Sequence, residues 1–154
     1  MTTVHSGIFR RVVTAFRIGE EISVDLTWCY DDGKYQVAAV GPWGRITGHA
    51  ADAFSALVEV RRALEIEGWR LAVAGARRDT YPSGMARSSG GFRAYEMRPG
   101  RPASSTVDIF DDAPTELIGT VDEQEENFRL WWGTRLLHFV ASWAGATVAD
   151  GVGT

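Results

Sequence analysis

Cysteine and histidine are scarce in this chain of 154 residues, and their scarcity removes several classes of site. The one cysteine, Cys29, has no partner for an internal disulfide and no C-x-x-C mate for a metal site. The histidines, His5, His49 and His138, lack metal-ligand spacings such as H-x-x-x-H. We therefore predict no disulfide, no metal and no cofactor, and we interpret Cys29 as a passive strand residue.

Long hydrophobic runs are also absent. The most apolar tract, Leu136 to Ala149, is shorter than the roughly 20 residues of a membrane span and contains polar side chains such as His138. The start, MTTVHSGIFRR, lacks a basic region followed by an apolar stretch, so we predict no signal peptide. The expected location is the cytoplasm, with no membrane partner.

Lysine occurs once, as Lys34, against 15 arginines, a bias that a GC-rich bacterial genome explains without any need for guanidinium chemistry. The net charge is −4, but residues 101–154 carry nine acids against three arginines, whereas residues 49–100 carry eight arginines against six acids. Nucleic-acid binding requires a strongly basic face and is disfavoured. The acidic end favours a basic protein partner instead.

The remaining composition is that of one globular domain spanning 1–154. Apolar residues make up 45% of the chain, which includes six Trp and seven Phe. A chain of this length buries roughly 68–70% of its unfolded surface, which is enough for a core. We expect only the last residues, about eight of them, to be loose.

The first half of the chain begins with a pattern of strands. Ile22 to Tyr30 alternates apolar and polar residues, Asp31 to Lys34 supplies an Asp-Gly turn, and Tyr35 to Val40 returns as the second arm of a hairpin. Ile8 to Ile18 suits a helix or a strand, and we choose a strand. The residues Gly41-Pro42-Trp43-Gly44 break the sheet.

A helix follows from about His49 to Glu67, with Arg61 on its apolar stripe and Gly68 as its C-cap. Further strands are expected over 69–74, 92–97 and 107–110, around an irregular passage from Gly75 to Gly91. The last helix starts at Thr120, where Thr120 and Glu123 form a capping box, and runs to about Ser142. The order βββαβββα predicts an α+β fold, a mostly antiparallel sheet packed with two helices.

The passage from Gly75 to Gly91 is the first candidate site. Arginines among glycines and hydroxyls suit a phosphate or carboxylate, because guanidinium pairs with both in a bidentate manner. The candidate ligand-binding residues are Arg77, Arg78, Asp79, Tyr81, Ser83 and Arg87. The alternative is a plain hairpin loop in which Asp79 pairs with an arginine, since no P-loop motif is present.

The second candidate site is the segment from Asp108 to Glu126, which holds eight carboxylates and no basic residue. Asp122 and Glu123 are explained by the helix dipole, and no EF-hand or glycosidase spacing occurs. The candidate partner-binding residues are Asp108, Asp111, Asp112, Glu116, Glu125, Glu126 and, in the aromatic last helix, Trp132. The alternative is a solvated acidic face.

Several motifs resemble a group of small, little-characterised bacterial proteins over about half of the chain. They are Glu67-Gly68-Trp69, the run from Gly75 to Arg87, Ala94-Tyr95, Val107-Asp108-Ile109-Phe110 and the start of the last helix at Thr120-Val121. Some proteins of this style look like immunity proteins encoded beside secreted toxins, which they inhibit by occluding the active site. The resemblance implies that the acidic segment mimics nucleic-acid phosphates, and it carries no catalytic residues.

Three functional hypotheses follow. The leading one is a cytosolic protein-binding module, most specifically an immunity-type inhibitor of a basic toxin domain, with no catalytic residue. The second is a small-molecule or anion-binding protein or enzyme that uses residues 75–91. The third is a homodimer formed through the aromatic last helix.

Overall fold

The computed structural model describes residues 7–100, 103 and 105–134 of the chain. The expected loose end, the last helix beyond residue 134, His5 and His138 lie outside the described residues. Within them the chain is α+β, as predicted, and every strand pairing between the named strands is antiparallel.

The N-terminal half forms a five-stranded sheet in the order β4-β3-β2-β1-β5. Its strands are β1 (Phe9–Arg17), β2 (Glu20–Asp31), β3 (Lys34–Gly41), β4 (Gly44–Ala50) and the short β5 (Arg70–Leu71). The predicted hairpin is confirmed, because Asp31 pairs with Lys34 across a turn in which Asp32 and Gly33 have φ of 51° and 79°. Strand β1 is confirmed as a strand.

The prediction of a break followed directly by a helix at His49 is wrong, because β4 lies between them. Gly41 pairs with Gly44 around a tight turn, and the Trp43 indole N–H donates to the Ala39 carbonyl at 3.0 Å. A turn signal of Gly and Pro marks the end of one strand without showing that another strand follows. Helix α1 (Ala53–Glu65) therefore starts later, after the N-cap Asp52.

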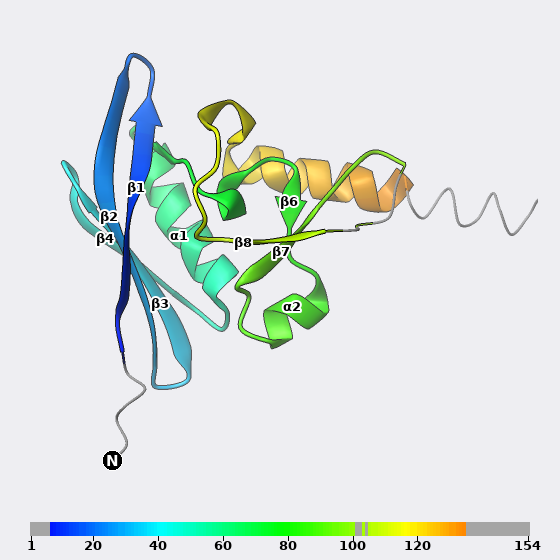
Figure 1. Cartoon of the computed structure of the whole chain (residues 1–154), viewed down its shortest axis with the longest axis horizontal. Helices are drawn as coiled ribbons and strands as arrows, with labels where there is room; N and C mark the ends of the chain where they lie inside the picture. The colour runs from blue at the N-terminus through cyan, green and yellow to red at the C-terminus, as the bar shows by residue number, and fades with distance from the viewer. Residues whose placement is uncertain (1–6, 101–102, 104, 135–154) are drawn as a thin grey trace, which may run out of the picture.

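Helix α1 packs across β3 and β4 on the inner face of this sheet (Figure 1). Gly48 permits the close approach, since a Cβ at this position would lie 2.3 Å from the Ala56 carbonyl oxygen. The helix ends at Glu65 with Ile66 as its C-cap, two residues earlier than predicted, and Gly68, with φ of +82°, closes the turn that follows by donating its N–H to the Glu65 carbonyl.

The second half of the chain contains a three-stranded sheet in the order β6-β7-β8. Its elements are the 3-10 turn η2 (Ala74–Ala76), β6 (Thr80–Tyr81), α2 (Gly84–Ser88), β7 (Arg93–Glu96), β8 (Thr106–Asp108) and the 3-10 turn η3 (Thr115–Leu117). The strand predicted over 69–74 is reduced to β5. The strand predicted over 107–110 ends at Asp108, because Ile109 and Phe110 turn into the core. The segment 75–91, predicted as loop, includes β6 and α2.

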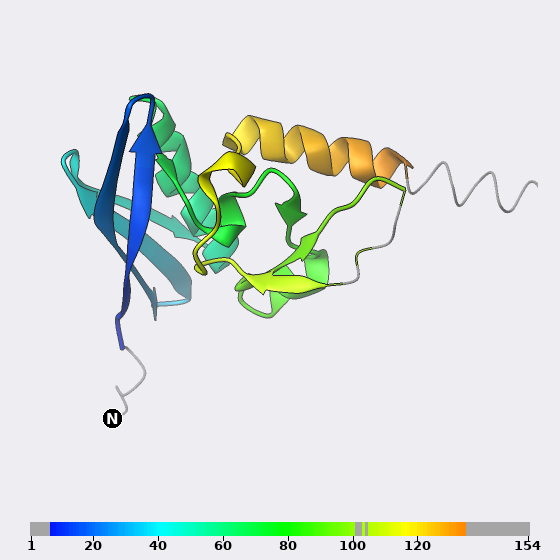
Figure 2. The same ribbon diagram turned by 45° about the horizontal axis from the view of Figure 1, so that its top comes forward.

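The final helix begins at Val121 and is described as far as Thr134. Its predicted capping box is confirmed: the Glu123 N–H donates to the Thr120 hydroxyl at 3.1 Å, and the Thr120 N–H donates to the Glu123 carboxylate at 2.7 Å. Figures 1 and 2 show this helix, in yellow to orange, alongside the second sheet and away from the first. One hydrophobic core extends from Val13 in β1 to Ile118, just before the helix.

Candidate functional site

Arg77, the first arginine of the predicted anion site, binds acids of its own chain. Its guanidinium lies 2.6 Å from Asp79 and 2.9 Å from Glu96. The hydrogen bonds that Arg77 donates to Asp79, and then the one that it donates to Glu96, raise the pKa of Arg77. Hydrogen bonds from Ser105 and then Arg77 lower the pKa of Glu96. The alternative for residues 75–91, a plain hairpin loop, predicted that Asp79 pairs with an arginine, and this pairing is confirmed.

Arg78 and Arg87 bind other groups in other directions. The Arg78 guanidinium donates to the backbone carbonyls of Ile118 and Glu116 at 3.1 and 2.5 Å. Arg87 donates to the Ser55 hydroxyl at 2.7 Å and lies 3.6 Å from the Asp52 carboxylate. The structure thus gives each of the three arginines its own set of partners and does not bring them around one anion.

Tyr81 and Ser83, the other candidate ligand-binding residues, also have structural roles. Ser83 caps α2, because its hydroxyl accepts from the Ala86 N–H at 3.0 Å. Tyr81 stacks on Phe128 with ring centroids 4.2 Å apart, and the Arg87 guanidinium lies 5.4 Å from the Tyr81 ring centre. Tyr81 thereby connects β6 and α2 with the final helix, and Ser83 fixes the start of α2.

A buried polar network at the base of the final helix was not predicted. Gln124 is 0% exposed and Arg61 is 2% exposed. The Arg61 guanidinium donates to the Gln124 side-chain oxygen at 2.6 Å and to the Gly119 carbonyl at 3.1 Å. The Gln124 amide nitrogen lies 2.9 Å from the carbonyl oxygens of Gly75, Arg77 and Thr80. The network joins α1, η2 and β6 to the final helix.

Burial is the main cause of the low pKa of Arg61, which falls to about 10. The position of Arg61 on the apolar stripe of α1 was the sequence signal for this burial. Nothing in the sequence indicated its partner, because Gln124 is 63 residues away. The network is satisfied within the protein and therefore serves the fold.

The acids before η3 are divided between different neighbours. Asp108 accepts from the Phe110 N–H at 2.9 Å, an Asx-type contact that shapes the end of β8. Asp111 and Asp112 both face Arg11 of β1, at 3.3 and 3.8 Å. These two carboxylates are exposed, but one guanidinium balances part of their charge.

A second acidic group lies at the start of the final helix, here called the acidic flank (Glu116, Asp122, Glu123, Glu125 and Glu126). A shallow hollow of about 490 Å³ contains the last four of these carboxylates and two guanidinium groups, Arg78 and Arg129. Arg62 of α1 lies 3.2 Å from Asp122 and 3.3 Å from Glu125, so one cation serves two carboxylates. The backbone hydrogen bond from Thr120 is the main cause of the lowered pKa of Glu123.

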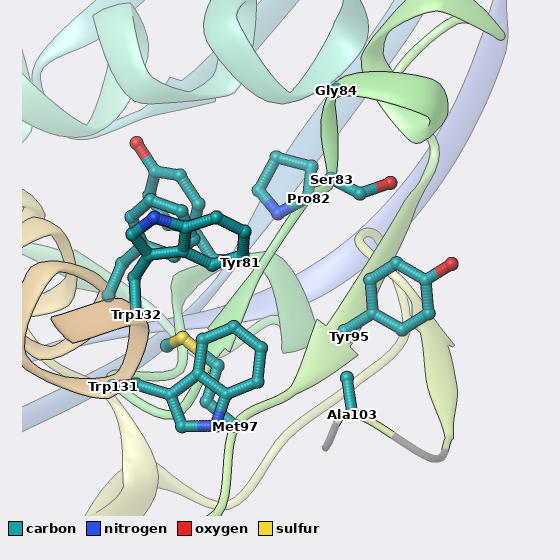
Figure 3. A pocket seen from close by; sticks show the side chains of 10 residues that line it. Tyr81, Pro82, Ser83, Gly84, Tyr95, Met97, Ala103, Trp131 and Trp132 are labelled. Carbon is teal, nitrogen blue, oxygen red and sulfur yellow. The ribbon is translucent and has the colours of Figure 1, made fainter. Parts of the chain in front are cut away.

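Trp132, the aromatic candidate, lines a pocket between the final helix and the second sheet (Figure 3). The pocket has a volume of about 420 Å³. Half of the described residues that line it are aromatic, and none of them carries an acid, amine, guanidinium or imidazole. The lining residues are Tyr81, Pro82, Ser83, Gly84, Tyr95, Met97, Ala103, Phe128, Trp131 and Trp132. Sequence reasoning identified only part of it, since its residues come from four separate segments.

Cys29 and His49 lie on the outer face of the first sheet, with Gln36 between them in the strand register. The His49 ring nitrogen Nε2 is 3.1 Å from the Gln36 side-chain oxygen, so Gln36 separates the thiol from the imidazole. Within residues 7–100, 103 and 105–134, no three His, Cys, Asp or Glu side chains gather as metal ligands. No helix in this same part of the chain is both long and apolar enough to cross a membrane.

Neither a known protein-family model nor a curated protein matches this chain.

Proposed function

We propose that this chain is a protein-binding module whose recognition surface is the final helix with its acidic flank, and that it inhibits a basic toxin domain by covering the active site. One observation carries the proposal. The described part of the final helix exposes large apolar side chains and carboxylates together, with Leu130 60% exposed and Trp132 54% exposed.

The apolar part of this surface has the composition of a binding hot spot. Tryptophan is enriched among the few residues that dominate interface energies, because it buries a large area at little entropic cost. Trp132 lies with Phe128 and Trp131 in a cluster whose ring centroids are 6.3 to 6.4 Å apart. A partner that covers Trp132 would also exclude water from this cluster.

The charged part of the surface supports a basic partner. Arg62 serves both Asp122 and Glu125, Arg129 pairs with Glu126, and no salt bridge to Glu116 occurs within the described residues. Some negative charge therefore remains at the acidic flank. Such charge speeds the encounter with a positively charged partner and orients it.

The arginines of residues 75–91 give less support to the alternative, an anion-binding protein or enzyme. Arg77 is engaged by Asp79 and Glu96, and Arg87 by Ser55 and Asp52. An incoming phosphate would compete with carboxylates that are already in place. The geometry therefore favours protein binding over anion binding for this molecule.

The experiment pairs this chain with the protein encoded by its neighbouring gene. Co-expression in a bacterial host should protect against growth arrest caused by that protein, and the two should co-elute as a complex. Glu116→Lys/Glu126→Lys should lose protection, whereas Glu21→Lys/Asp31→Lys, which changes the net charge equally at the first sheet, should retain it. A complex without protection would contradict inhibition, and the absence of any complex would contradict the whole proposal.

A further inference from the structure

The aromatic pocket beside the final helix has the character of a ligand site. We propose that it binds one uncharged planar ring of a small molecule, about the size of a fused bicyclic heteroaromatic. This inference goes beyond the proposed protein partner: it uses none of the acidic flank and shares Trp132 with the proposed recognition surface.

The shape of the pocket favours a flat ligand. In Figure 3 the indoles of Trp131 and Trp132 lie on one side together with Met97 and the Tyr95 ring lies on the other, with Pro82 between them. The volume of about 420 Å³ lies in the range of small-molecule sites. Rings that meet in stacked or edge contacts gain more than their buried area alone provides, so these walls prefer an aromatic ligand to an aliphatic one.

The charges near the pocket favour a neutral ligand. Arg87, which lies against the Tyr81 ring, is paired with Asp52, and Arg77 is paired with Asp79 and Glu96. Among the residues that the structure describes, no charged side chain lines the cavity itself. An anion would lose its hydration without gaining a partner, which favours a neutral ligand over an anionic one.

The walls are held in place before any ligand arrives. The Trp131 indole N–H donates to the Arg98 carbonyl at 3.1 Å, which fixes one wall. Tyr81 is stacked between Phe128 and the Arg87 guanidinium, and Met97 is only 6% exposed. A preformed site spends less binding free energy on ordering its own side chains.

The rim supplies polar groups for the edge of the ring. Figure 3 shows the hydroxyls of Ser83 and Tyr95 on the side opposite the two tryptophans. The Ser83 oxygen accepts from the Ala86 N–H, so its own proton remains available to a ligand acceptor. A heteroaromatic ring with a nitrogen or oxygen at its edge therefore fits better than a pure hydrocarbon.

The test is a titration of the full chain with indole, followed by NMR of the tryptophan indole N–H signals. Indole should shift the Trp131 and Trp132 signals saturably, with a Kd on the order of 1 mM for so small a ligand. Cyclohexanol, which is uncharged but aliphatic, should bind roughly fivefold more weakly. Absence of a saturable shift with indole, or equal binding of cyclohexanol, would overturn the proposal.

Matched variants locate the site. Trp132→Leu and Tyr95→Leu, on opposite walls, should each weaken indole binding by about tenfold, whereas Leu130→Ala on the same helix but outside the pocket should leave it unchanged. The hydrogen-bonded Trp131 signal reports whether each variant keeps its fold. If Tyr95→Leu folds and binds indole normally, the assignment is wrong.

A third probe separates a free ligand from a partner's side chain. N-acetyl-tryptophanamide should bind more weakly than indole, because its two amides would lose water against ring faces. Equal or tighter binding would assign the pocket to a partner's tryptophan and overturn the small-molecule proposal. Glu116→Lys/Glu126→Lys should not affect indole binding, so this inference and the proposed function fail separately.

Discussion

The start of the final helix and the end of its described part reverse the usual distribution of polar and apolar side chains. The start buries a polar amide, Gln124, which is 0% exposed, whereas two turns later the large indole of Trp132 is 54% exposed. Folding alone favours the opposite arrangement, because apolar burial drives it and polar burial requires compensation. The start of the helix meets that requirement with hydrogen bonds, and the later turns leave apolar area available for binding.

The two parts of the helix have different roles. Gln124 and Arg61 are hydrogen-bonded within the chain, so their loss should affect stability. Trp132 and the acidic flank lie at the surface, so their loss should affect binding. Substitutions of Gln124 and Arg61 should therefore reduce the free energy of unfolding more than substitutions of Trp132 do.

Gln124→Leu should reduce the free energy of unfolding by about 3 kcal/mol, because it leaves the Arg61 guanidinium and three carbonyls without their buried partner. Urea denaturation followed by circular dichroism measures the change. A loss below about 1 kcal/mol would show that the network does not hold the helix in place.

Arg61→Met should reduce the free energy of unfolding by about 2 kcal/mol. The Gln124 oxygen and the Gly119 carbonyl lose their donor, but the burial penalty that lowers the pKa of Arg61 to about 10 also disappears. Urea denaturation of wild type and Arg61→Met measures this loss, with Arg62→Met on the exposed side of α1 as the control. Equal losses in the two variants would contradict the account.

Glu123 should make stability depend on pH in the acidic range. Its hydrogen bonds from Thr120 lower its pKa below the ordinary value of 4.5, so the charged form stabilises the folded state. That contribution is complete above about pH 4.5 and is lost as the pH falls through the lowered pKa. The difference in the free energy of unfolding between wild type and Glu123→Gln should therefore narrow below pH 4 in urea melts. A difference that widens there would mean that folding raises the pKa of Glu123 and would contradict the prediction.

Trp132→Leu should change the free energy of unfolding by less than about 0.5 kcal/mol, since the indole is more than half exposed. Thermal denaturation of this variant beside Gln124→Leu compares the two positions directly. A loss comparable to that of Gln124→Leu would mean that Trp132 belongs to the core.

The sequence was most informative where structure depends on near neighbours. The Asp32-Gly33 turn, the turn at Gly68 after α1 and the Thr120–Glu123 capping box each depend on residues within a few positions of one another. Strand β4 was missed because Gly41 and Gly44 read equally well as the end of a sheet and as a tight turn within one.

The candidate sites were harder to predict because they depend on contacts between distant segments. Arg77 meets Glu96, 19 residues away, and Arg61 meets Gln124, 63 residues away. The aromatic pocket combines β6, β7 and the final helix, so periodicity within any one of them does not show it. The α+β class and antiparallel pairing were nevertheless correct, because hairpin signals report both.

The most direct test of the central claim is the association rate between this chain and the protein encoded by its neighbouring gene, measured over a series of salt concentrations. The account predicts that Glu116→Lys/Glu126→Lys slows association by about tenfold at low salt and flattens its salt dependence, whereas Glu21→Lys/Asp31→Lys has little effect. Equal slowing by both double variants would show that only net charge matters and would contradict the assignment of the final helix and its acidic flank as the recognition surface.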